Sequence, residues 1–256
     1  MSGGGSAVEL RAVSLAFGDG LQVLDGIDLG VREGEILALI GPSGCGKSTI
    51  LNLIAGALAP TSGSVECFGQ PVRGLNRRVS YMTQRDTLLP WRSALDNAAL
   101  PLEIAGVGRR ERYERARAEL ARLGVGEFGA FRPHQLSGGM RSRLSLARAL
   151  LADAQIFLMD EPFAAIDALL RLRLQQLLVD VWSETRRTIV YVTHDLNEAI
   201  SLAHRIVVLS HRPARILAVR DVDLPHPRDV AQIRTTERAQ AMYWELWKIL
   251  EGELQG

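Results

Sequence analysis

The chain has 256 residues, of which 47% are hydrophobic and 23% charged, and its formal net charge is +1. An ordinary apolar fraction with almost no net charge excludes disorder for the bulk of the chain and disfavours a general nucleic-acid binder. Two cysteines are too few for a disulfide framework, which favours a reducing compartment. No apolar run reaches the roughly 18 residues that a membrane span needs. We expect a soluble protein whose glycine-rich residues 1–6 form a flexible lead-in.

The first third of the chain predicts two kinds of strand. Residues 8–17 and 21–31 alternate apolar with polar side chains around the turn signal Gly18-Asp19-Gly20. They predict antiparallel strands with one face in water. Residues 35–40 form a continuous apolar run, which is typical of a parallel strand buried on both faces. A glycine-rich loop and a helix follow, and strand, loop and helix together make one half of a doubly wound unit.

The middle of the chain predicts a helical insertion. Residues 96–123 carry Ala, Leu, Arg and Glu at helical spacing, and we expect breaks at Pro101 and at 106–108. A further helix should follow Ser137 and reach Leu150. We place this helical subdomain at about 86–152.

The last third returns to buried strands. Residues 155–160 and 188–193 predict two more parallel strands with a helix over 169–185 between them, and residues 205–219 predict a closing hairpin. A polar link then leads to an amphipathic helix around 243–250. The fold class is therefore α/β, with a main domain over 7–220 and a C-terminal extension over 221–256 that carries one helix. That helix could pack back on the domain or meet a partner, and we favour packing.

The loop after the first buried strand matches the phosphate-loop pattern G-x-x-x-x-G-K-[ST] in the context that this pattern demands. Its glycines let consecutive N–H groups curl around an anion, and the helix dipole adds positive potential. Lys47, one of only two lysines in the chain, would reach the β- and γ-phosphates, while the Ser48 hydroxyl would complete a magnesium shell. The alternative, a glycine-rich turn that merely contains a lysine, is disfavoured by this context. The predicted phosphate-binding residues are Gly41, Pro42, Ser43, Gly44, Cys45, Gly46, Lys47, Ser48 and Thr49.

Two carboxylates follow the next buried strand. Asp160 and Glu161 stand where the carboxyl end of a parallel strand opens onto a ligand crevice. Asp160 can hold Mg²⁺, and Glu161 can polarise a water for attack on the γ-phosphate. Acidic residues at strand ends are common, so the hypothesis depends on the phosphate loop.

Ser137, Gly138 and Gly139 predict a second anion site. A serine and two glycines at a helix start offer a hydroxyl, free N–H groups and the positive end of the helix dipole. The alternative is a simple N-cap, a role that Ser137 also satisfies.

With the phosphate loop, the serine-glycine segment at 137–139 and the paired carboxylates in this order along the chain, the sequence resembles the ABC-type ATPase family, from about Val8 to Val219. The resemblance implies a P-loop NTPase core of the RecA-like type, with a parallel sheet, an antiparallel β subdomain and a helical insertion. It implies ATP hydrolysis with Mg²⁺, in which Ser48, Gln84 and Asp160 serve the metal. It further implies that Phe17 stacks on adenine, that Asp167 crosses a dimer interface, and that His194 contacts the γ-phosphate. As alternatives, Phe17 could be a plain core aromatic and His194 structural.

Other segments are similar to the importer subfamily for nitrate, sulfonates such as taurine, and related small solutes. They are 84–91, 133–141, 160–163, 212–216 and 225–228. The sequence departs from the family in two places: Ser142 replaces the usual glutamine, and Ala164-Ala165-Ile166 replaces a more usual Gly/Ser-Ala-Leu. Neither is a catalytic group, although the rate of dimer closure could change. An exporter or lipid-extracting ATPase, or a soluble ABC ATPase outside transport, remains an alternative.

The partners follow from the same reasoning. Phosphate loop and signature are separated by the helical insertion, so we expect a head-to-tail dimer in which Ser137 of one copy closes on ATP held by the other. The apolar segment 88–91 predicts a docking groove for a helix of a membrane permease, with a solute-binding protein outside the membrane. Alternatively, Trp91 fills the core of the insertion. The resemblance thus implies a peripheral protein on the cytoplasmic face of the membrane.

Overall fold

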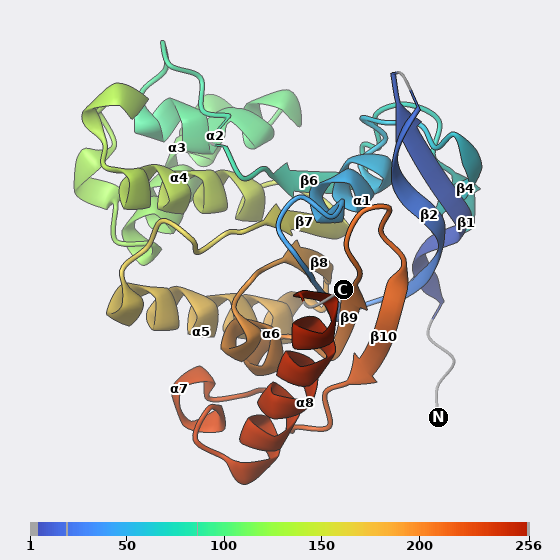
Figure 1. Ribbon diagram of the computed structural model, residues 1–256. Helices are drawn as coiled ribbons and strands as arrows, with labels where there is room; N and C mark the ends of the chain where they lie inside the picture. Colours follow the sequence, from blue (N-terminus) through green and yellow to red (C-terminus); the bar gives the residue numbers. More distant parts are fainter. Residues whose placement is uncertain (1–4, 19, 86, 255–256) are drawn as a thin grey trace. The chain divides into compact units, whose positions relative to one another are not determined.

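The computed structural model describes residues 5–18, 20–85 and 87–254, which form two compact units (Figure 1). The first unit combines the N-terminal part, up to Arg77, with the C-terminal part from Gln175 onward, and the second spans 78–174. Four residues of the predicted lead-in, and Asp19 of the predicted turn, lie outside the described residues. Ser6 already belongs to a strand, so the structure ends the lead-in one residue earlier than predicted.

An antiparallel sheet opens the first unit. Strands β1 (Ser6–Phe17) and β2 (Leu21–Arg32) pair antiparallel, as predicted, with apolar side chains buried on one face. Strands β4 (Ser62–Cys67) and β5 (Gln70–Pro71) complete the strand order β2-β1-β4-β5. These two short strands were not predicted, because β4 alternates weakly and β5 has only two residues.

Three parallel strands form the centre of the first unit. β3 (Ile36–Ile40) lies between β8 (Thr188–Val192) and β9 (Arg205–Leu209) and is parallel to both. All residues of β3 and β8 are buried, which is why their sequences are continuously apolar. β10 (Ile216–Asp221) runs antiparallel to β9 and confirms the predicted hairpin.

Helices connect and extend these strands. α1 (Lys47–Ile54) follows β3, α6 (Leu196–Leu202) follows β8, and α5 (Ala168–Thr185) runs from the second unit into the first. The C-terminal extension holds α7 (Val230–Ile233) and α8 (Glu237–Leu254), so the prediction of one helix was wrong. α7 is a single turn capped by the preceding aspartate, too short to show a period. Among the described residues, no helix is long and apolar enough to cross a membrane.

A half-buried histidine pair packs in the first unit. His204 accepts a hydrogen bond from the Ile36 N–H at 3.0 Å and stacks on His226 with ring centroids 4.0 Å apart. Burial, helped by the charge of Arg228, lowers the pKa of His204 to about 4 and that of His226 to about 3. Both rings are therefore neutral in the folded protein at neutral pH.

We expect the protein to lose stability as the pH falls from about 6.5 towards 4. In that range the unfolded histidines bind protons and the folded ones do not, so acid favours unfolding. Both rings keep partial exposure to water, which limits the expected loss to about 2 kcal/mol. Denaturant unfolding at pH 7.5 and 4.5 measures it. His226→Phe should reduce the loss, whereas His134→Gln, on an exposed position, should leave it unchanged; equal losses in all three proteins would contradict the assignment.

The described part of the second unit contains two strands, three whole helices and the first residues of α5. β6 (Val79–Met82) and β7 (Ile156–Asp160) pair in parallel. The helices are α2 (Ala94–Ile104), α3 (Arg109–Arg122) and α4 (Gly138–Leu150), and short 3₁₀ turns lie at 126–128 and 133–135.

The predicted helix break at Pro101 is wrong, whereas the break at 106–108 is confirmed. Proline removes one N–H from the helix and costs about 3 kcal/mol in an interior position. α2 continues through it because Ala98 and Leu102 are buried on the face that packs against α3 and α4. Tertiary packing therefore overrides the local signal.

Candidate nucleotide site

The phosphate loop lies between β3 and α1 and is shaped by its glycines. Gly46 has φ +124°, and a Cβ atom there would lie 2.8 Å from Cδ2 of Leu24. A Cβ atom on Gly41 would lie 2.8 Å from the carbonyl oxygen of Leu209. Larger residues would therefore displace the loop from the core. The N-cap of α1 is Gly46, which has no side chain that could accept from the N–H groups at the helix start. An uncapped helix start of this kind fits an anion.

Lys47 is buried inside this loop, with 8% of its surface exposed. Its Nζ donates hydrogen bonds to the carbonyl oxygens of Gly41 at 2.8 Å and of Pro42 at 2.7 Å. A buried ammonium is costly without such partners. The loop thus holds a positive charge at its centre, as a polyphosphate site requires. Ser48 and Thr49, in the first turn of α1, are half-buried.

Two further side chains of the first unit lie at the loop. His194 lines a hollow together with Gly41 and Pro42, so the structure brings this predicted residue to the loop. The Nε of Arg212 donates to the Gly44 carbonyl at 2.9 Å. Sequence reasoning missed this contact: residues 212–216 only resembled a subfamily segment, and nothing in their pattern indicated the loop.

Phe17 ends β1 with 43% of its surface exposed. An aromatic side chain that belonged to the core would be covered, so Phe17 is not a plain core aromatic. Stacking on adenine stays a prediction.

The carboxylate residues occupy the end of β7 in the second unit. Asp160 is the last strand residue and is 5% exposed. The burial of Tyr81, together with the negative charge of Asp160, raises the pKa of the Tyr81 hydroxyl well above its usual range. Glu161 has φ +51° and accepts a hydrogen bond from Nε2 of Gln84 at 3.4 Å. A left-handed non-glycine residue is strained, and such strain gathers at functional sites. The structure thus joins Gln84 to Glu161, although they are far apart in sequence.

The signature residues begin α4 in the same unit. Ser137 is the N-cap and accepts from the Met140 N–H at 3.3 Å, so the simple capping role is present. Gly138 and Gly139 precede the first helical hydrogen bond, and a Cβ atom on Gly139 would lie 3.2 Å from the Ala165 carbonyl. Asp167 accepts from the Leu170 N–H at the start of α5. Ser137 and Asp167 are both exposed, and their roles at a dimer interface stay predictions.

A family model described as "ABC transporter" matches residues 24–164, more than half of the chain. The chain belongs to this family. It is 44% identical over 221 residues to the taurine import ATP-binding protein TauB of Pseudomonas aeruginosa, covering 85% of this chain and 84% of that protein. It is 47% identical over 213 residues to TauB of Chromobacterium violaceum, covering 83% and 82%. A solved dimer of the ATP-binding cassette MJ0796 with ADP and phosphate superposes with TM-score 0.78 and 31% identity, covering 85% of this chain and 100% of that chain.

Membership confirms three predictions for this ABC protein. The family resemblance is correct, and the fold is that of an ABC ATPase cassette. The chain is an ATP-binding protein with ATPase activity, and the related cassette with ADP and phosphate is a post-hydrolysis state.

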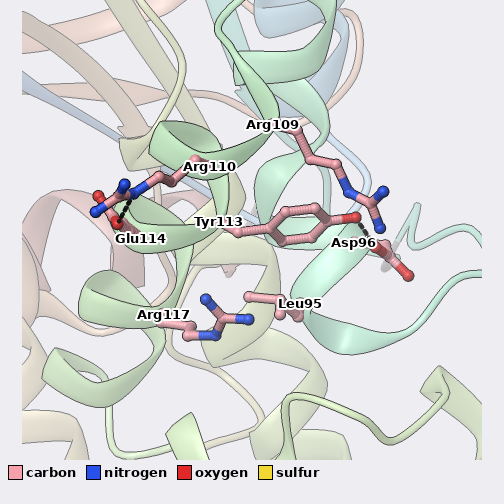
Figure 2. Close-up of a pocket in the computed structure, with 7 residues that line it drawn as sticks. All are labelled: Leu95, Asp96, Arg109, Arg110, Tyr113, Glu114 and Arg117. Atoms are coloured by element: carbon pink, nitrogen blue, oxygen red, sulfur yellow. Dashed lines mark hydrogen bonds and ion pairs between the residues drawn. The ribbon is translucent and has the colours of Figure 1, made fainter.

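The second unit of this ABC ATPase also contains an open hollow of about 620 Å³ between α2 and α3. Figure 2 shows Tyr113 extending across it between Arg109 and Arg117, with its hydroxyl donating to Asp96 at 2.6 Å. Arg110 is paired with a glutamate at 3.0 Å. None of the predicted site residues lines this hollow, so it is separate from the nucleotide chemistry.

Proposed function

We propose that this ABC ATPase is the ATP-hydrolysing subunit of an importer for a small solute of the nitrate, sulfonate or taurine kind. The observation that carries the proposal is the similarity to two TauB proteins over more than four fifths of this chain. The chain would work at the cytoplasmic face of the membrane, bound to permease subunits that receive solute from an extracytoplasmic binding protein.

We assign the hydrolysis steps to named residues. The phosphate loop and Lys47 hold the polyphosphate, and the Phe17 ring stacks on adenine. Glu161 takes a proton from the attacking water, and His194 contacts the γ-phosphate. These roles are supported by the buried ammonium, the strained Glu161 and the place of His194 beside the loop.

Mg²⁺ fits the oxygen donors of this chain. Ser48, Gln84 and Asp160 offer hydroxyl, amide and carboxylate oxygens, the hard ligands that Mg²⁺ prefers. Asp160 is a buried carboxylate, which favours a metal role over a surface one. Bound Mg²⁺ would neutralise charge on the phosphates.

Two copies would form the working assembly, with Ser137 and Gly139 of one copy closing on ATP held by the other. The proposal is supported by the exposed helix start at Ser137 and by the solved MJ0796 cassettes, which are dimers. A second copy would add N–H groups and a helix dipole to the phosphates.

The second unit offers a groove for the permease. A hollow of about 280 Å³ is lined by side chains from β6, the following loop, α2 and α4, among them Tyr81, Leu89 and Ile104. Ile104 is 79% exposed and Trp91, in the loop before α2, is 69% exposed. Trp91 therefore does not fill the core of the insertion. Exposed apolar residues of this kind favour an apolar helix of a partner as the occupant.

We expect Trp91→Ala to weaken permease binding about tenfold or more, because an exposed tryptophan that becomes buried in an interface is a frequent hot spot. Tagged Glu161→Gln protein, with ATP and Mg²⁺, would be captured from detergent-solubilised host membranes and its partners identified by mass spectrometry. Trp91→Ala in that background should recover less permease, while the control Trp244→Ala should recover the parental amount. Recovery of ribosomal or DNA-bound proteins without a permease would contradict the transport proposal.

A further inference from the structure

The C-terminal helix α8 reaches the phosphate loop within the first unit (Figure 1). A hollow of about 170 Å³ beside the loop is lined on one side by Gly41, Pro42 and His194. On the other side it is lined by Trp247, Leu250 and Glu251 of α8. The α8 residues lie about 200 residues after the phosphate loop and about 50 after His194 in sequence, and neither the hydrolysis steps nor the docking groove uses the α8 side chains.

A second, independent connection joins the end of α8 to the same loop. The Glu253 carboxylate accepts a hydrogen bond from the His211 N–H at 3.0 Å. The next residue, Arg212, donates through its guanidinium to the Gly44 carbonyl of the phosphate loop. The last turn of α8 therefore holds the β9–β10 turn, and that turn holds the phosphate loop.

The position of Trp247 is fixed by the rest of α8. Leu246 and Ala239 are 0% and 3% exposed, and the helix packs against α6 and β9. Trp247 itself is 42% exposed and stacks on Tyr243, with ring centroids 6.4 Å apart. Its removal would leave the buried face of α8 intact. A large aromatic that is dispensable for the core and lies beside a phosphate loop points to a role in the site.

We propose that α8 is a positioning element of the nucleotide site. Trp247 and Leu250 form an apolar wall beside Pro42 and His194, and Glu253 fixes the turn that holds Gly44. Trp247 does not touch the reacting atoms; it acts through the loop and the histidine. Removal of the wall lets the loop sample other arrangements, so that part of the ATP binding energy is spent on ordering it.

The first test compares steady-state ATP hydrolysis of matched variants. We expect Trp247→Ala to raise KM for ATP about tenfold with a smaller change in kcat, and Trp247→Phe to restore most of the affinity. Glu253→Ala should also raise KM for ATP. Trp244→Ala is the control, because Trp244 lies on the same helix, is more exposed at 59%, and does not line the hollow.

Tryptophan fluorescence gives a readout that a merely structural role would not move. Addition of ATP and Mg²⁺ should change the emission of the parent and of Trp244→Phe, and most of this change should be absent in Trp247→Phe. This comparison also decides the matter if Trp247→Ala unfolds. A parental KM in Trp247→Ala, or an undiminished emission change in Trp247→Phe, overturns the proposal. Neither measurement involves a permease, so failure here leaves the importer proposal untouched.

Discussion

The Glu161→Gln variant is expected to lose ATP hydrolysis by about 100- to 10,000-fold, the usual contribution of a general base, while it keeps ATP binding. Glutamine has the shape of glutamate but cannot accept a proton from water. It can retain the contact with Gln84, whose Nε2 lies 3.4 Å from the Glu161 carboxylate, and the left-handed backbone is unchanged. The loss should therefore be one of chemistry and not of folding.

Two measurements check this result. Phosphate release gives the rate, and light scattering with ATP and Mg²⁺ should show a stable species of twice the chain mass of 28.1 kDa. Glu184→Gln, an exposed change on α5, is the matched control and should hydrolyse ATP at the parental rate without a trapped dimer. Parental hydrolysis by Glu161→Gln would show that another group activates the water.

The second large effect is expected for Lys47→Ala, which should weaken ATP binding about 100-fold or more. Lys47 places a buried ammonium at the centre of the phosphate loop, where charge-assisted hydrogen bonds to phosphate oxygens are strong. Its removal also takes away the hydrogen bonds that Nζ donates to the Gly41 and Pro42 carbonyls, of which the Pro42 carbonyl keeps the bond from the Cys45 N–H, so the loop loses a group that orders it.

Equilibrium binding of a fluorescent ATP analogue measures the affinity, and thermal unfolding without nucleotide reports the fold. The second lysine of the chain supplies the control, because Lys248 is exposed on α8 and does not line the hollow beside the loop. Lys248→Ala should bind the analogue like the parent. If Lys47→Ala also bound it like the parent, the loop would not be the polyphosphate site.

Local sequence was sufficient to predict the candidate residues of the nucleotide site. The phosphate loop, the carboxylates after β7 and the serine at the start of α4 are each formed by consecutive residues. Their conformations depend on the adjoining strand or helix, and those elements are strongly apolar or periodic. The same reason explains why β3, β7 and β8 were predicted within one residue at either end, since strands buried on both faces are continuously apolar.

Contacts between distant segments needed the tertiary structure. The α2 helix continues through Pro101 because Ala98 and Leu102 on either side of it are buried, and Trp91 is exposed although a tryptophan side chain suits a core. The wall of Trp247 beside the phosphate loop and the bond from Arg212 to Gly44 join segments about 170 to 200 residues apart. Periodicity specifies which face of a helix is buried but not which neighbour covers it. The sequence by itself therefore determined the family and the fold class and predicted the reacting groups, whereas only the packing of the chain decided which distant segments support the phosphate loop.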